Sequence, residues 1–140
     1  MKGYNVIIIL NKALDKILLC ERKKNPYSGM KNFVGGKIEK GESSIDAAYR
    51  ELQEETSITK NDVKLIHLMD FTYHLDNIYV EVWVGQLNKD LEVKGDENYL
   101  FWSSLDHNFF DLDTYAGEGN MGHMLEHVKM KKDELFKKES

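Results

Sequence analysis

The segment from Gly35 to Ile58 constrains this chain more than any other, because its composition changes from loop to helix within a few residues. It carries two adjacent glycines, two lysines, an arginine and a dense group of acidic residues. Ser43 followed three residues later by Asp46 is typical of a helix N-terminus. We therefore predict a helix that begins at residue 43 or 44 and ends near residue 56.

The predicted helix has two distinct faces. Glutamates at i, i+3 and i+4 share one face, with side chains about 5–6 Å apart, and Arg50 is the cation nearest to them. Clustered carboxylates suit Mg²⁺ or Mn²⁺, which prefer hard oxygen ligands. An acidic helix face in water is the alternative explanation. The three glutamates are Glu51, Glu54 and Glu55, and the apolar stripe of the other face is Ile45, Ala48 and Leu52.

The loop before this helix favours the metal-site interpretation. Its glycines, Gly35 and Gly36, allow close approach of the backbone to a ligand, because glycine has no Cβ. Lys37 places a cationic side chain beside them. A glycine turn, a lysine and an acidic cluster together are suited to binding and cleaving a phosphate chain.

One long, gapped pattern runs through this segment: Gly36, Glu42, Arg50-Glu51-Leu52, Glu54-Glu55 and Ile58. The pattern resembles the Nudix box of the Nudix hydrolase family. Ser57 departs from it, because the family usually has glycine there. That position lies where the predicted helix ends, so the departure concerns the helix C-cap more than the chemistry.

The resemblance implies a divalent cofactor, Mg²⁺ with Mn²⁺ as the alternative, and a set of ligands for it. Glu54 and Glu55 would bind the metal, the carbonyl of Gly35 would complete the shell, and Glu51 would be either a ligand or the base that deprotonates water. Glu97 precedes the last expected strand, where family members often carry an extra metal-binding or basic glutamate. A loop charge without a role is the alternative for Glu97.

The resemblance also implies roles beyond metal binding. Arg50 would orient the carboxylate of Glu51, and Lys37 would hold a substrate phosphate. Glu51, Glu54, Arg50 and Glu97 are thus the predicted catalytic residues.

Two asparagines are candidates for reading the base of a nucleotide. Asn32 and Asn120 resemble base-contacting positions of family members that act on oxidised guanine nucleotides, and an amide offers both donors and an acceptor. A turn residue or a helix cap is the alternative for each. Lys31 stands where a tryptophan is often found, which weakens the inference about base preference.

The resemblance favours a nucleoside triphosphate pyrophosphohydrolase of the MutT branch, with 8-oxo-dGTP as a candidate substrate. Tyr73 lies near a tyrosine of the diadenosine polyphosphate hydrolases, so another nucleoside diphosphate derivative is the alternative. ADP-ribose is disfavoured, because no proline follows Pro26. A non-catalytic nucleotide sensor on the same scaffold is the alternative from another class, although such proteins tend to have damaged boxes.

Composition limits the remaining classes. A net charge of -5 argues against binding to a nucleic-acid polymer. Cys20 is the single cysteine, so no intrachain disulfide forms, and no apolar stretch is long enough for a membrane span or signal peptide. We expect a cytoplasmic protein, a monomer or homodimer, without a membrane partner.

Periodicity predicts an α/β fold. Apolar runs and period-two alternation predict strands, and 3.6-residue periodicity predicts two helices. Strands on both sides of a central helix favour a mixed β-sheet between helices, which agrees with the single-domain α/β/α sandwich of the Nudix fold that the resemblance implies for residues 1–140. The expected strands are 6–10, 16–20, 63–75, 78–87 and 99–102, and the expected terminal helix is 123–138.

Overall fold

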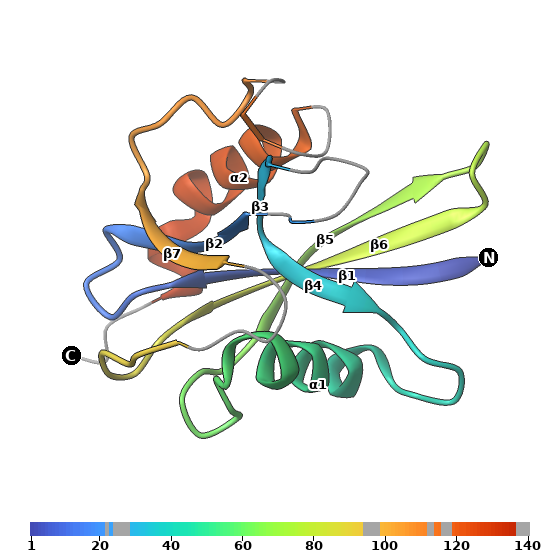
Figure 1. The fold of residues 1–140 in the computed structure, drawn as a ribbon, viewed down its shortest axis with the longest axis horizontal. Helices are drawn as coiled ribbons and strands as arrows, with labels where there is room; N and C mark the ends of the chain where they lie inside the picture. Colours follow the sequence, from blue (N-terminus) through green and yellow to red (C-terminus); the bar gives the residue numbers. More distant parts are fainter. Residues whose placement is uncertain (22, 24–28, 94–98, 112–113, 116–118, 137–140) are drawn as a thin grey trace.

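The computed structural model describes residues 1–21, 23, 29–93, 99–111, 114–115 and 119–136, and these form a mixed sheet between two helices (Figure 1). One helix covers each face of the sheet, so the predicted α/β/α sandwich is confirmed. The elements in chain order are β1 (Lys2–Leu10), β2 (Lys16–Glu21), β3 (Lys31–Asn32), β4 (Val34–Lys37), α1 (Ser44–Thr56), β5 (Ile66–Tyr73), β6 (Ile78–Gln86), β7 (Tyr99–Ser104) and α2 (Asn120–Leu135).

Strand β1 organises the sheet. It runs parallel to β6 and antiparallel to β2 and β4, and the strand order is β3-β2-β1-β6-β5, with β4 attached to β1 and β7 attached to β2. On one edge β1 changes partner, because residues 4–7 pair with β4 whereas Leu10 pairs with β2. Strands β2 and β4 therefore share this edge of β1 and leave it at different points.

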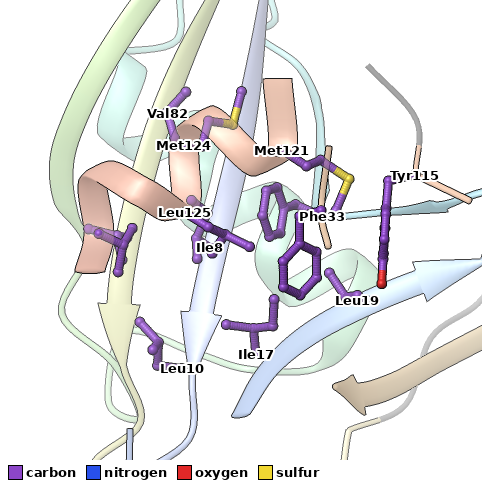
Figure 2. Close-up of a cluster of buried hydrophobic side chains, with 13 residues drawn as sticks. Ile8, Leu10, Ile17, Leu19, Phe33, Val82, Tyr115, Met121, Met124 and Leu125 are labelled. Atoms are coloured by element: carbon purple, nitrogen blue, oxygen red, sulfur yellow. The ribbon is translucent and has the colours of Figure 1, made fainter. Parts of the chain in front are cut away.

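The apolar run of β1 is buried on both faces, as its composition predicts. Ile7 and Ile9 face α1, and Ile8 and Leu10 face α2, all without exposed surface. This is the alternation that a strand between two helical layers requires. Figure 2 shows the α2 side, where Met121, Met124 and Leu125 pack over residues of β1 and β2.

Several element boundaries differ from the sequence-based expectation. β1 begins at Lys2 because its parallel pairing with β6 extends to Ile78. The expected strand 63–75 is shorter, Ile66–Tyr73, and Val63 forms only an isolated bridge with Leu87. Helix α2 begins three residues before the expected start.

Candidate active site

Helix α1 begins and ends as its sequence predicts. The Ser43 hydroxyl accepts a hydrogen bond from the Asp46 amide at 3.3 Å, which satisfies one of the free amides of the first turn. At the other end Ser57 has φ 68°, and its amide donates to the Gln53 carbonyl at 2.9 Å. The serine that departs from the Nudix box thus adopts the left-handed C-cap that favours glycine.

The inner face of α1 packs on β1 and β4 and places two of the glutamates at the sheet. Ala48 and Leu52 are completely buried beneath the helix. Glu51 precedes Leu52 and follows Ala48 by three residues, so its side chain reaches the glycines of β4 while 13% of it stays exposed. The packing of Ala48 and Leu52 against the sheet therefore determines where the glutamate side chains lie.

The glycines of β4 lie directly against these carboxylates. A Cβ on Gly36 would overlap the carboxylate carbon and oxygens of Glu51, and the Gly35 amide donates to Glu55 Oε2 at 3.1 Å. Gly35 has φ 152°, and a Cβ there would overlap the Asn5 carbonyl. Only glycine fits at either position without a shift of its neighbours, so the sequence pattern reflects close contact between strand and helix.

Arg50 connects the acidic groups to one another. Its Nε and Nη2 bond the two Glu42 oxygens at 2.6 and 2.9 Å, and its Nη2 also bonds the Lys37 carbonyl at 3.0 Å. Its Nη1 donates to Glu51 at 2.9 Å and to Glu54 at 3.2 Å. The guanidinium fork holds the Glu42 carboxylate with two hydrogen bonds, a geometry that lysine cannot reproduce. The predicted contact of Arg50 with Glu51 is present.

The pKa values of two carboxylates in the cluster are shifted in opposite directions. The hydrogen bonds from Arg50 lower the pKa of Glu42 to about 2, with the Glu39 amide as the next contributor. Burial raises the pKa of Glu51, an effect that Arg50 opposes and that the Glu54 and Glu42 charges reinforce. Glu42 is thus an ion-pair partner, whereas Glu51 is a carboxylate whose charge is disfavoured by its surroundings.

These residues fit a divalent metal by the chemistry of their donors. The side chains of Glu51 and Glu55, from α1, contact Gly36 and Gly35 of β4. Arg50 donates hydrogen bonds to both Glu51 and Glu54. All the donor atoms available to a metal here are oxygens. Such donors suit Mg²⁺ or Mn²⁺. Within the described part of the chain, no three His, Cys, Asp or Glu side chains are already gathered as metal ligands. Water and the Gly35 carbonyl would complete the coordination.

A cavity of about 210 Å³ lies next to this cluster and connects it to Asn32. Its lining comes from the region where β2 and β4 leave the edge of β1. The Asn32 Oδ1 accepts from the Phe33 amide at 2.8 Å, so this atom already has a local partner. The lining residues are Tyr4, Asn5, Val6, Cys20, Asn32, Phe33, Val34, Gly35, Gly36 and Glu55.

Asn120 lies on the α2 side of the sheet and is not part of the lining of this cavity. It is the first residue of α2, and its Nδ2 donates to the Tyr73 hydroxyl at 2.5 Å. Two residues of interest for substrate recognition are therefore in contact with each other. Lys31, the neighbour of Asn32, forms a bridge with Tyr115, and its amide donates to the Thr114 carbonyl at 2.9 Å. Residues 114–115 precede α2 in the chain.

Two further predicted site residues are Lys37 and Glu97. Lys37 is exposed and is fixed by its carbonyl to Arg50. A second cavity, of about 380 Å³, is lined by Lys2, Lys37 and Lys40 together with acidic and apolar residues. Glu97 lies outside the described residues, so its predicted role stays a prediction.

Sequence reasoning overlooked Asn5. Its Oδ1 accepts from the Gly36 amide at 2.9 Å, which ties the glycine strand to β1 across 31 residues. The signal was a polar residue directly before the apolar run of β1, at a position that the alternation of the strand turns inward. The residue is 3% exposed.

Comparisons with known proteins agree with this geometry. The NUDIX domain family matches residues 1–127. An ADP-ribose pyrophosphatase of Methanocaldococcus jannaschii is 32% identical over 90 residues, which cover 56% of this chain and 53% of that protein. An 8-oxo-dGTP diphosphatase of Escherichia coli is 31% identical over 86 residues, covering 60% and 67%. The match thus spans about half the length of the first relative.

Solved structures show the same fold. An Ap4A hydrolase of C. elegans superposes with a TM-score of 0.77 at 22% identity, covering 96% of this chain and 99% of that chain. The chain belongs to the Nudix family, as its motif indicates. Among the described residues, no helix has the length and apolar character needed to cross a membrane.

Proposed function

We propose that this chain is a Mg²⁺-dependent hydrolase that cleaves the pyrophosphate linkage of a nucleoside triphosphate to give a nucleoside monophosphate and pyrophosphate. Mn²⁺ would substitute for Mg²⁺, and 8-oxo-dGTP is a candidate substrate. The observation that carries the proposal is the Glu51 carboxylate, seated on Gly36 and bonded to Arg50 beside a cavity. The E. coli relative is named an 8-oxo-dGTP diphosphatase.

The residues of the site match the requirements of this reaction. A phosphate anhydride resists attack because its negative charge repels a nucleophile, so a bound divalent ion supplies charge neutralisation and activates water. Gly35, Glu51, Glu54 and Glu55 would hold that ion. Glu51 is either one of its ligands or the proton acceptor, a role that a carboxylate with a raised pKa suits.

Arg50 and Lys37 prepare the site for charge. Arg50 fixes the carboxylates of Glu51 and Glu54 in one arrangement through its Nη1, which reduces the reorganisation needed during reaction. Lys37 ends β4 and precedes the loop to α1. It lines the cavity of about 380 Å³ together with Lys2 and Lys40. Ammonium groups there would attract the phosphate chain.

A second candidate is hydrolysis of another nucleoside diphosphate derivative, such as a dinucleoside polyphosphate. The Tyr73 hydroxyl contacts Asn120, so a tyrosine lies beside a predicted base-reading residue. A ring at this position offers a surface on which a second base stacks.

Purified protein should be incubated with Mg²⁺ and a panel of 8-oxo-dGTP, dGTP, ATP, diadenosine tetraphosphate and ADP-ribose. Products are identified by ³¹P NMR as pyrophosphate or phosphate. Fastest turnover of a triphosphate with release of pyrophosphate supports the first proposal, and fastest turnover of the dinucleotide supports the second. Fastest turnover of ADP-ribose refutes the expectation based on the missing proline.

Glu54→Gln tests catalysis separately from binding. This variant should keep the fold, measured by circular dichroism, and lose turnover, because a neutral amide replaces a carboxylate of the acidic cluster. Unmodified protein that binds nucleotide in the presence of Mg²⁺ without hydrolysing it would support the sensor alternative.

A further inference from the structure

Two of the buried polar atoms without a hydrogen-bond partner among the described residues belong to residues that are paired with each other beneath α1. They are Nδ2 of Asn5 on β1 and Oε2 of Glu81 on β6. A buried polar group left unsatisfied costs about 1–3 kcal/mol, and buried polar groups in folded proteins are nearly always paired. Two such atoms in one region require an explanation.

Asn5 and Glu81 are neighbours. They are directly paired in the parallel register of β1 and β6, so their side chains leave the sheet on the same face. Nδ2 can only donate a hydrogen bond and a carboxylate oxygen can only accept one. A single water molecule between them would satisfy both, because water can accept from Nδ2 and donate to Oε2.

The remaining atoms of both side chains hold two other elements. Asn5 Oδ1 accepts from the Gly36 amide at 2.9 Å, and Glu81 Oε1 accepts from the Ser44 hydroxyl at 2.9 Å. Ser44 is the first residue of α1, and Gly36 lies directly under the carboxylate of Glu51. The pair therefore connects the start of the acidic helix to the strand against which its carboxylate rests.

A third buried polar atom without a partner among the described residues is Nε1 of Trp83, which lies two residues beyond Glu81 on the same face of β6. Trp83 is paired with Ile7 on one side and with His67 on the other. Its ring makes an edge contact with the His67 ring, at 5.2 Å between centroids. Of these three residues, Asn5 and Glu81 are the two that are paired directly with each other.

We propose that Asn5 and Glu81 share one buried water and act as positioning residues, which set the depth of Gly36 and thereby the position of Glu51. In this role both residues act through Gly36 and Glu51, although Asn5 also belongs to the lining of the cavity of about 210 Å³. The kinetic consequence rests on the proposed function, whereas the water and the contact with Gly36 do not. Stability and amide exchange, measured without nucleotide or metal, therefore test this inference even if the proposed activity fails.

The first test exchanges the donor and the acceptor. Asn5→Asp places a second carboxylate beside Glu81, and Glu81→Gln places a second donor beside Asn5. In the double variant the carboxylate at position 5 would still accept from Gly36 and the amide oxygen at position 81 would still accept from Ser44, while the donor and the acceptor that face the water are reversed. Asn5→Asp alone should lower the melting temperature strongly, and adding Glu81→Gln should recover most of that loss.

The second test follows the Gly36 amide by hydrogen exchange in NMR. Asn5→Leu should accelerate exchange at Gly36 by at least tenfold, while the Gly35 amide, bonded to Glu55, stays protected. In steady-state assays the same variant should lower kcat at least tenfold with little change in KM. Ser103→Ala removes a buried hydroxyl on β7, outside the acidic cluster, and serves as the control that leaves kcat unchanged.

Two results would overturn the inference. Additive effects of Asn5→Asp and Glu81→Gln on the melting temperature would show that the two side chains share no partner. Unchanged exchange at Gly36 in Asn5→Leu would show that Asn5 does not hold the glycine strand. Recovery of stability in the double variant together with recovery of kcat would distinguish positioning from a purely structural role.

Discussion

Replacing Gly36 with alanine tests the central contact of the site. The backbone of Gly36 does not have a positive φ, so alanine adds no backbone strain. Its Cβ would instead overlap the Glu51 carboxylate, a side-chain terminus that can move. The substitution therefore acts on the position of Glu51, a proposed catalytic residue, while leaving the strand itself intact.

The expected losses of kcat and of stability follow from the displacement of the Glu51 carboxylate. To accommodate a methyl group its carboxylate has to shift by about 1 Å, and a misplacement of that size can cost about 10²-fold in rate. The shift also strains the hydrogen bond from Arg50; a hydrogen bond to a charged group contributes about 1.5–3 kcal/mol. We expect kcat to fall about 100-fold, and the free energy of unfolding to fall by about 1–2 kcal/mol if part of that bond is lost.

The assay combines steady-state kinetics with urea unfolding of four proteins: the unmodified chain, Gly36→Ala, Glu51→Asp and the double variant. The shorter aspartate leaves room for the methyl group, so the double variant should lose less stability than the sum of the single variants, by about 0.5–3 kcal/mol. Gly35→Ala provides the contrast, because its Cβ would meet the Asn5 backbone, which cannot move aside. It should destabilise the fold itself. Normal kcat in Gly36→Ala, or additive stability effects, would refute the reasoning.

Three further predictions follow from local geometry. Ser57→Gly should raise the free energy of unfolding by about 0.5–1 kcal/mol, because glycine relieves the left-handed strain at φ 68°; urea unfolding checks this, and a loss of stability would contradict it. Arg50→Lys should lower kcat at least about tenfold, because one ammonium cannot replace the guanidinium fork; an unchanged kcat would contradict it. Arg50 lowers the pKa of Glu42 to about 2, so the ionised Glu42 carboxylate stabilises the folded chain above pH 4.5, and this contribution is lost as the pH falls toward 2. The melting temperature of Glu42→Gln should therefore approach that of the unmodified chain across this range, and a constant difference would contradict the ion pair.

The sequence predicted those parts of the site that depend on local spacing. Glu51 and Glu55 are four residues apart on one helix, so helical periodicity alone places them on one face. Ser43 and Asp46 define the start of that helix through a contact three residues long. The glycines were predicted to form a turn that approaches a ligand, but they lie in strand β4 instead, and their close contacts are with the Asn5 backbone and the Glu51 carboxylate.

Contacts between distant segments were beyond such reasoning. The bond from Gly36 to Asn5 spans 31 residues and depends on the antiparallel pairing of β4 with β1. The contact of Asn120 with Tyr73 spans 47 residues and depends on how α2 packs on the sheet. Neither has a period or a spacing that marks it in the chain, since only the assembled sheet brings these residues together.

The clustered charges of α1 destabilise the helix, a cost that the proposed metal site would explain. Glu51, Glu54 and Glu55 are like charges at i, i+3 and i+4, an arrangement that destabilises an isolated helix by about 0.2–0.5 kcal/mol per pair. Arg50 offsets part of this through Glu51 and Glu54, while Glu55 bonds to the Gly35 amide. Local sequence preferences are commonly violated at functional sites.

This cost yields a prediction opposite to the usual effect of a mutation. In EDTA, Glu54→Gln should raise the free energy of unfolding by about 0.2–0.5 kcal/mol, because it removes one repulsive charge from an exposed position and keeps an acceptor for Arg50. Added Mg²⁺ should stabilise the unmodified chain more than the variant, since a ligand that binds only the folded state stabilises it. Thermal unfolding in EDTA and in Mg²⁺ measures both effects. A variant less stable than the unmodified chain in EDTA would show that the carboxylates do not repel one another, and their clustering would then give no reason to expect a bound cation.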